Sequence, residues 1–485
     1  SGAMWPRLQP SLASLSPGTC FFAAVSRCTQ SHPPLRRTAG LLCEAWLCGL
    51  CLPAVLRTAL QAGVKTLCRF LGPRLFRSGF LFVCAGAASR CVPSACVAPE
   101  YALRWGMMSI VLSIIAVYGL LHAYVFFVVF RTFSLHPAAL IPLAVLLATM
   151  AAAPFLVRAL DRHGYELSAQ LLAWPFYFWM ALLLWFCTLM LLMDLWNLPV
   201  RAAGRWLPLF KGLVIPHRVS FFLAVGLSLT GLLAGTVEAM NIRVKTVHLP
   251  TSKIPAGSPP IKILYVSDVH LDIGRGRRTM KHILRIARDL KPDLFLSGGD
   301  VVDTAAAHLK PYAEALEQFR PPLGKYGVLG NHEYYARLTE SLAFYRMAGI
   351  ELLRESVALV HSNLLLMGVD DPAGSYTRQP YFSDESALSR HRNRSAFTIL
   401  LKHQPRISDI ASTLCDLQLS GHTHGGQIFP FHLVVRLLYP WEPGLNNTGS
   451  LLLYVSRGAG AWGPPLRLLA PPDVTLIVLE PHPAP

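Results

Sequence analysis

Four long and nearly uncharged apolar segments occupy the first half of the chain, at about 107–130, 138–157, 169–193 and 219–237. Each reaches or approaches the roughly 20 residues that a helix needs to cross a hydrocarbon core of about 30 Å. Charged residues lie at the edges of these segments and tryptophans lie in or near them, as is typical of membrane spans. We therefore expect a multi-span helical membrane region of about four helices over residues 107–240, with three or five spans as alternatives.

The composition agrees with a chain that is half embedded in a membrane. Charged residues make up 15% of the sequence, well below the roughly 25% of soluble domains. The net charge is +17, and residues 1–106 contribute +9 of it through eleven basic and two acidic residues. Because this excess lies in a tail or flanks a membrane, it does not indicate nucleic-acid binding, and no nucleic-acid partner is expected.

Residues 1–106 form a basic leader that is rich in Cys and Pro and has no recognisable fold. Nine of the eleven cysteines lie between Cys20 and Cys96. The single CxxC, Cys48–Cys51, has no second pair of ligands nearby, so we expect no zinc site there. The leader is interpreted as disordered or as an artefact of the assigned start, with Met107 or Met108 as the true start. A targeting peptide stays open as an alternative.

The second half has the pattern of a layered α/β domain over residues 261–485, which follows a proline-containing linker at 241–260. Short apolar runs bounded by turn residues alternate with helical patterns at 278–290 and 306–319, which favours strands alternating with helices. The expected strands are 261–266, 294–296, 326–329, 364–369, 398–401, 417–419, 452–455 and 474–479.

Five clusters rich in His and Asp each follow one of these strands. They are Asp268-Val269-His270, Gly299-Asp300, Gly330-Asn331-His332-Glu333, His403 and Gly421-His422-Thr423-His424. The strands of an α/β sheet present their sites beyond their carboxyl ends, so these clusters are expected to lie close together. Carboxylate, imidazole and amide donors suit Mn²⁺, Fe or Zn²⁺ rather than Ca²⁺. The sequence therefore predicts a hydrolytic metal site.

In this order the clusters resemble the calcineurin-like metallophosphoesterases, over about residues 261–480. Flanking residues extend the resemblance: Ser267, Asp303, Leu401-Lys402-His403-Gln404-Pro405, Gly425-Gly426-Gln427 and Ser456-Arg457-Gly458. These flanking residues look most like the membrane-associated or exported branch. The resemblance implies a layered β-sandwich flanked by helices. One departure is Gly298, where the family has a bulkier residue, and we expect only a small local change there.

The resemblance also implies roles for the residues of a site with two divalent metal ions. Asp300 would bridge the two ions, Asp268, His270 and His424 would complete the first, and Asn331, His403 and His422 would complete the second. His332 would act as general acid, and Asp303 would orient a histidine. The metal is expected to be Mn, Fe or Zn.

The resulting hypothesis is a membrane-anchored phosphoesterase that acts on a phosphomonoester or phosphodiester, with a lipid-linked phosphate or phospholipid as one option. Two alternatives stay open. One is a non-catalytic sensor that binds metal or phosphate, and the other is a transport or scaffold protein with a regulatory C-terminal domain. The sequence does not predict the oligomeric state.

Two further features have open interpretations. The apolar stretch that includes 429–431, 437–439 and Trp441 fits core packing, which we expect, or a membrane-facing lip that admits an amphiphilic substrate.

The loop between the third and fourth spans carries Arg201, Arg205, Lys211 and Arg218. The positive-inside rule makes that loop cytoplasmic and places the C-terminal domain on the extracytoplasmic face, whereas the basic leader argues for the opposite orientation.

Overall fold

The computed structural model describes residues 98–271, 276–303 and 306–482. Residues 106–485 form one compact unit, and the fold below is that of its described part. The predictions for the leader at 1–106, including Cys48–Cys51, lie outside the described residues except for 98–106, which begin helix α3.

The predicted membrane region consists of long helices. They are α3 (Ala98–Phe133), α4 (Pro137–Arg162), α5 (Glu166–Ala203) and α6 (His217–Ala239), with the short η1 (Pro208–Leu213) between the last two. Over the described residues, four helical segments are long and apolar enough to cross a membrane, as predicted. Large apolar side chains such as Leu120 and Ile141 are 68% and 67% exposed on their outer faces, which suits contact with lipid rather than water.

The helices pack against each other through a small apolar core. Val128 of α3, Leu147 of α4, Met190 of α5 and Ala224 of α6 are buried in it. Beside this core, Nη2 of Arg131 lies 2.6 Å from a carboxylate oxygen of Asp194, which also accepts a hydrogen bond from Tyr124. Pairing and hydrogen bonding lower the cost of placing these charges between apolar helices.

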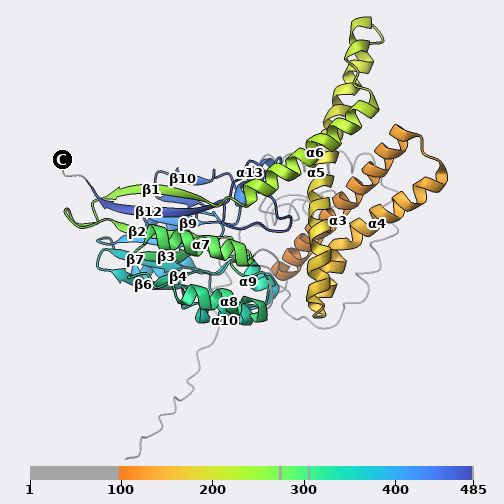
Figure 1. Ribbon diagram of the computed structural model, residues 1–485. Coiled ribbons are helices and arrows are strands. Elements are labelled where there is room, and N and C mark those ends of the chain that lie inside the picture. The colour runs from red at the N-terminus through yellow and green to blue at the C-terminus, as the bar shows by residue number, and fades with distance from the viewer. Residues whose placement is uncertain (1–97, 272–275, 304–305, 483–485) are drawn as a thin grey trace, which may run out of the picture. The chain divides into compact units, whose positions relative to one another are not determined.

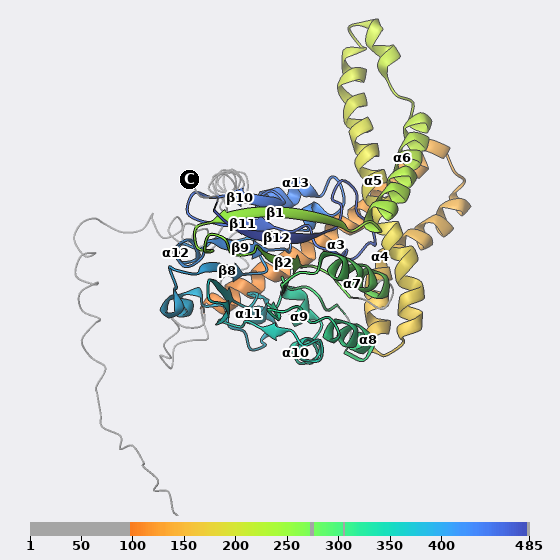
Figure 2. The ribbon, with the colours of Figure 1, turned by 60° about the vertical axis from the view of Figure 1, so that its left-hand side comes forward.

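The C-terminal half contains two six-stranded sheets. The first has the order β1 (Arg243–Thr251), β12 (Asp473–Pro481), β2 (Ile261–Val266), β3 (Leu294–Ser297), β4 (Lys325–Gly327) and β5 (Glu351–Leu352). The second has the order β10 (Gly444–Asn447), β11 (Leu452–Val455), β9 (Leu417–Ser420), β8 (Phe397–Leu401), β7 (Leu364–Gly368) and β6 (Ser356–His361). Buried side chains from both sheets, such as Ile263 and Leu366, share one core, so the sheets form a sandwich (Figures 1 and 2).

Helices cover the outer faces of the sandwich. On the first sheet, α7 (Gly276–Leu290), α8 (Ala306–Glu317) and α10 (Leu338–Met347) bury apolar side chains in a second core (Figure 2). Short helices line the loops: α9 (Asn331–Tyr335), α11 (Ala373–Thr377), η2 (Glu385–His391), α12 (Ala411–Leu414), η3 (His424–Gly426) and α13 (His432–Leu438). Residues of η2 and α12 pack on the second sheet. The predicted layered α/β architecture is confirmed.

The predicted linker at 241–260 is wrong for residues 243–251, which form strand β1. All nine residues of β1 pair in parallel with β12, from Arg243 opposite Asp473 to Thr251 opposite Pro481. The prolines that suggested a linker do not prevent this pairing, because Pro250 is near the end of an edge strand, where a missing N–H is tolerated. Since β1 begins four residues after α6 ends, the last span is joined directly to the first sheet.

Candidate metal centre

The predicted ligands lie just beyond the carboxyl ends of strands from both sheets. Asp268 and Asp300 follow β2 and β3, Asn331 follows β4, and His403 and His422 follow β8 and β9. The pairs β2–β3, β3–β4 and β8–β9 are parallel, so these loops meet at one edge of the sandwich. Backbone bonds from Asp268 N and His270 N to Gly299 O and Asp300 O, 3.0 Å each, hold the first two loops together.

The donor atoms converge into overlapping groups in which all atoms lie within 4.8 Å of one another. One group contains Asp268, His270 and His424, another contains Asp300, His403 and His422, and a third, of His270, Asp300 and His332, shares a residue with each. Oδ2 of Asp300 lies 3.1 Å from Nε2 of His403 and 4.0 Å from Nε2 of His270. The Asp300 carboxylate therefore lies between the two groups.

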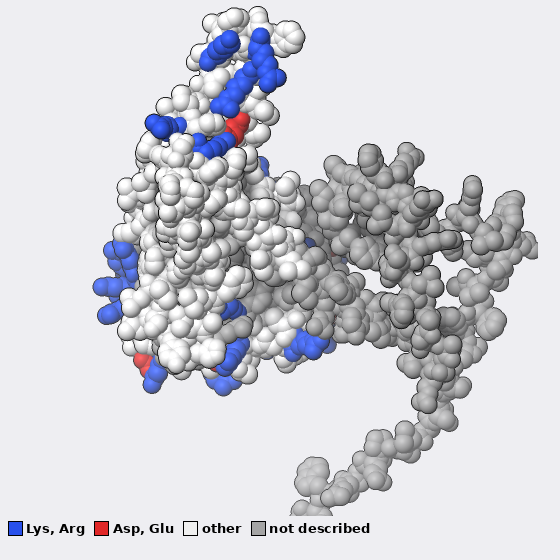
Figure 3. All heavy atoms as spheres, turned by 90° about the vertical axis from the view of Figure 1, so that its right-hand side faces the viewer, with Lys and Arg blue, Asp and Glu red and all other residues white. Residues whose placement is uncertain are grey.

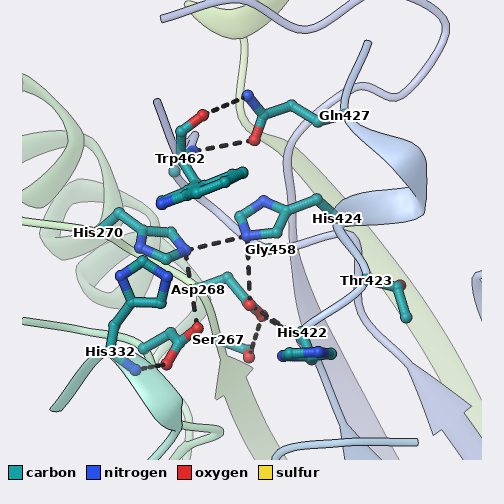
Figure 4. A network of polar contacts seen from close by, with 12 residues as sticks. Ser267, Asp268, His270, His332, His422, Thr423, His424, Gln427, Gly458 and Trp462 are labelled. Atoms are coloured by element: carbon teal, nitrogen blue, oxygen red, sulfur yellow. Dashed lines mark hydrogen bonds and ion pairs between the residues drawn. The ribbon is translucent and has the colours of Figure 1, made fainter. Parts of the chain in front are cut away.

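The remaining predicted ligand completes the second group. Oδ1 of Asn331 lies 2.9 Å from Nδ1 of His422, which is 3.3 Å from Nε2 of His403. In the first group, the Nε2 atoms of His270 and His424 face each other at 2.9 Å, as shown in Figure 4. Imidazole nitrogens and carboxylate oxygens that converge in a buried space fit divalent transition metals. The structure thus brings all seven predicted ligands together.

The backbone of the site is strained. Five of the seven predicted ligands, Asp268, His270, Asp300, His422 and His424, have φ between +49° and +69°. This left-handed region is disfavoured for residues with a Cβ, and such strain clusters at functional sites. In two of the loops, two ligands that are separated by one residue both have this conformation, Asp268 with His270 and His422 with His424.

Burial and neighbouring charges set the protonation states of the metal-free site. Burial lowers the pKa of His422 to about 3, with a further contribution from His403, and burial together with Arg467 lowers the pKa of His424 well below its usual value. These two rings are therefore neutral, which is the form that binds metals. Although burial opposes it, the Asp300 carboxylate raises the pKa of His403 well above its usual value.

Asp303 joins two histidines of the cluster. Its Oδ2 lies 2.9 Å from Nδ1 of His270 and its Oδ1 lies 2.6 Å from Nδ1 of His332. Burial opposes ionisation of Asp303, but the charges of His270 and His332 outweigh it and lower the pKa of the carboxyl. Burial likewise opposes protonation of His332, yet Asp303 and Asp300 raise the pKa of that ring to about 9. The contacts match the orienting role expected for Asp303.

Glu333 organises the loop that carries Asp300. Its fully buried carboxylate accepts hydrogen bonds from the backbone N–H groups of Gly330, Asp300, Val301 and Val302, at 2.7–3.1 Å. The sequence places Glu333 inside a motif, and the structure identifies the backbone groups that it binds.

Arg467 supports His424 from the opposite side to His270. The side chain is fully buried, and Nη2 lies 3.0 Å from Nδ1 of His424, while Nη1 donates to the His424 carbonyl oxygen at 3.0 Å. This residue was not predicted from the sequence. The available signal was a single charged residue between apolar neighbours, Leu466 and Leu468.

Trp462 lies over the cluster. Its indole lies above the rings of His270 and His424 in Figure 4, and its centroid is 6.0 Å from that of His332. Gln427 fixes the Trp462 backbone by accepting from its N–H at 2.9 Å and donating to its carbonyl oxygen at 2.7 Å. Because Trp462 is 56% exposed, its side chain forms part of the mouth of the site.

The glycine that departs from the family pattern has a local explanation. A Cβ at Gly298 would overlap the hydroxyl group and ring of Tyr265 and the side chain of Ser267. The Gly298 carbonyl oxygen accepts from Nδ1 of His403 at 2.8 Å. Tyr265 therefore occupies the space of the missing side chain, and the His403 contact is kept.

Comparisons with known proteins agree with this geometry. The family model described as calcineurin-like phosphoesterase matches residues 261–426. An uncharacterised metallophosphoesterase of Aquifex aeolicus is 38% identical over 246 residues, covering 50% of this chain and 94% of that protein. A metallophosphoesterase of Campylobacter jejuni is 36% identical, covering 49% of this chain and 63% of that protein.

A transmembrane protein with metallophosphoesterase domain from Danio rerio is 33% identical over 272 residues, covering 53% of this chain and 62% of that protein. The chain thus matches nearly the whole length of the Aquifex relative and somewhat less than two thirds of the other two. On this similarity, the chain belongs to the calcineurin-like metallophosphoesterase family.

Proposed function

We propose that the chain is a membrane-anchored phosphoesterase that uses two divalent metal ions to hydrolyse a phosphomonoester or phosphodiester. The observation that carries this proposal is the convergence of seven carboxylate, imidazole and amide donors from loops of both sheets. The family and the apolar helices support it.

In this proposal one ion is held by Asp268, His270 and His424, the other by Asn331, His403 and His422, and Asp300 contributes to both. The position of Asp300 between the groups supports the bridging role. Mn, Fe or Zn suits the donor set. When bound, such cations lower the pKa of water and neutralise phosphoryl oxygens.

The protein's own proton chemistry lies at His332. The ring is held by Asp303 at 2.6 Å and packs edge-on against His270, with centroids 4.6 Å apart. In the metal-free site Asp303 and Asp300 raise the pKa of His332 although burial opposes it, and a protonated ring at this position can donate to the leaving oxygen as general acid. Asp303 holds the ring in place and stabilises its charge.

For orientation, we propose that the catalytic domain lies on the extracytoplasmic face. Lys and Arg side chains gather at the tip formed by α5, η1 and α6, beside a broad uncharged surface (Figure 3). The basic residues of this turn are Arg201, Arg205, Lys211 and Arg218, and the positive-inside rule places them in the cytoplasm. Protease digestion of sealed vesicles of known sidedness tests this: the domain should be cleaved from the outer side only.

The activity is tested with the full chain purified in detergent, stripped of metal and reloaded with Mn²⁺. We expect metal-dependent hydrolysis of bis-(4-nitrophenyl) phosphate or 4-nitrophenyl phosphate, and the preferred compound distinguishes a diesterase from a monoesterase. Asp300→Asn should abolish turnover, whereas Asp409→Asn, outside the cluster, should not. Metal binding without hydrolysis of any phosphoester would favour a non-catalytic sensor instead.

A further inference from the structure

A cavity of about 270 Å³ lies where the apolar helices meet the catalytic domain. One wall comes from the spans and includes Trp174 of α5 and Thr236 and Met240 at the end of α6. The other wall comes from the domain and includes His270, Arg278 and Ala461. The cavity therefore reaches from the lipid-facing helices to a predicted metal ligand.

The two walls differ in chemistry. The span wall is largely apolar, while Arg278 in the first turn of α7 adds a positive charge at the N-terminal end of that helix. Cationic side chains and helix N-termini favour phosphate. The domain wall also contains Ala459, Gly460 and Ala461, whose small side chains leave the space between His270 and the spans open. An anionic head near the cluster and an apolar tail against α5 and α6 fit this arrangement.

Direct contacts join the spans to the loops around the cluster. Nε1 of Trp185 donates to the carbonyl oxygen of Phe429 at 2.6 Å, and Arg467 N donates to the carbonyl oxygen of Gly235 at 3.0 Å. Ala181 and Trp185 of α5 share a small core with Ile428 and Leu466. The loops that carry His424 and Arg467 thus pack against helices that face lipid.

The helix after the ligand pair, α13, presents an apolar surface. Leu437 and Leu438 are 77% and 66% exposed, and Leu433 is 56% exposed. Phe429 and Phe431, just before the helix, are also exposed. The expectation of core packing is wrong for these residues, and Pro430, Tyr439 and Trp441 of this stretch are half-buried. An apolar surface continuous with membrane helices fits insertion into the same bilayer.

We propose that the substrate is an amphiphile that carries a phosphate ester, and that it enters the metal centre laterally from the bilayer through this cavity. The inference rests on the proposed phosphoesterase function and specifies its substrate class. The phosphate reaches the cluster beside His270, the apolar chain lies between Trp174 and Met240, and α13 holds the mouth of the site at the membrane surface.

The test compares two probes with the same reacting group, methyl 4-nitrophenyl phosphate and dodecyl 4-nitrophenyl phosphate. The full, Mn²⁺-loaded chain is assayed in phosphatidylcholine nanodiscs. We expect kcat/KM to be at least about tenfold higher for the dodecyl compound, since even one methylene in an apolar pocket is worth roughly this much. Thr236→Trp and Ala239→Trp, which fill the cavity, should lower the dodecyl-to-methyl ratio of kcat/KM by about tenfold.

Leu229→Trp is the matched control, because Leu229 lies on the same helix, is 46% exposed and does not line the cavity. Partitioning of the dodecyl compound into the nanodisc is the same for all variants. A lower dodecyl-to-methyl ratio of kcat/KM in the cavity variants alone is therefore an effect of the cavity itself. Equal ratios in Thr236→Trp, Ala239→Trp and Leu229→Trp would overturn lateral entry.

A second readout does not depend on turnover. Dodecyl phosphate with a diazirine at the chain end should label residues near Trp174 and Met240 on irradiation, and excess dodecyl phosphate should suppress this labelling. Labelling confined to the outer faces of α3 and α4 would overturn the proposal. Hydrolysis of both probes without chain preference overturns lateral entry alone, whereas hydrolysis of neither of these diesters nor of the monoester 4-nitrophenyl phosphate overturns the proposed function as well.

Discussion

Nδ1 of His332 lies 2.6 Å from Oδ1 of Asp303, whose other oxygen lies 2.9 Å from Nδ1 of His270. One carboxylate therefore orients both the proposed general acid and a proposed metal ligand. In the proposed mechanism, His332 can therefore be removed while the seven proposed ligands remain. A change at Asp303 would affect both the general acid and a ligand.

His332→Ala should lower kcat by roughly 10²–10⁴-fold, the usual contribution of a general acid, while the metal content stays unchanged. The measurement is steady-state kinetics together with metal analysis of the same samples. His361→Ala, an exposed histidine outside the cluster, is the control and should leave kcat unaltered. An unchanged kcat in His332→Ala would remove this residue from the mechanism.

The metal-free protein should lose stability as pH rises from about 6.5 to 9. The pKa of His332 is raised from 6.5 to about 9 in the folded chain, so its contribution is complete below pH 6.5 and lost as pH rises through 9. His403, whose pKa is also raised, acts in the same direction. The His332 contribution is on the order of 2–3 kcal/mol. In thermal unfolding in detergent, the Tm of His332→Gln should therefore fall less steeply with pH than that of the unsubstituted chain. A Tm that is constant or rises over this range in the unsubstituted chain is the contrary result.

Glu333→Gln should destabilise the catalytic domain and weaken metal binding together. The substitution replaces a carboxylate that accepts four backbone N–H groups with an amide that repels some of them, at a cost of about 2–5 kcal/mol. The measurement is Tm alongside the Mn²⁺ dissociation constant. Glu351→Gln, at an exposed position, is the matched control. Normal metal affinity in Glu333→Gln would show that the 299–302 loop does not depend on this carboxylate.

The pair Arg131–Asp194 allows a test of the membrane region. Arg131→Leu alone leaves the half-buried Asp194 carboxylate without its cation and should destabilise the helices by roughly 1–3 kcal/mol. The double variant Arg131→Leu/Asp194→Leu should recover most of that loss, since two apolar side chains suit the surroundings. Unfolding of the full chain in detergent, in a double-mutant cycle, measures the coupling. Additive losses would mean that the two charges act independently.

The spans, most strands and the ligand clusters were predictable because each is indicated by a pattern of neighbouring residues in the sequence. The four spans follow from length and lack of charge, and strands such as 261–266 and 397–401 are short apolar runs bounded by turn residues. The ligand clusters stand out because His and Asp recur directly after such strands. The order of these motifs along the chain then predicted which residues belong to the same site.

The parts that were missed depend on contacts that are distant in sequence. Strand β1 is stabilised by β12, which lies more than 200 residues later. Pro250 and the prolines that follow the strand suggested a linker instead. Arg467 gains its role only where the 458–470 segment folds back onto His424. The apolar sequence of α13 does not predict whether the helix is buried in a core or exposed, because the segments that pack around it lie elsewhere in the chain.

The central claim is that the seven clustered residues hold two divalent ions joined by Asp300. The most direct measurement is electron paramagnetic resonance of the full chain loaded with Mn²⁺, combined with metal analysis. We predict two ions per chain and the spectrum of an exchange-coupled Mn²⁺ pair, with coupling lost in Asp300→Asn. A single uncoupled ion, or the same coupled spectrum in Asp300→Asn, would contradict the account.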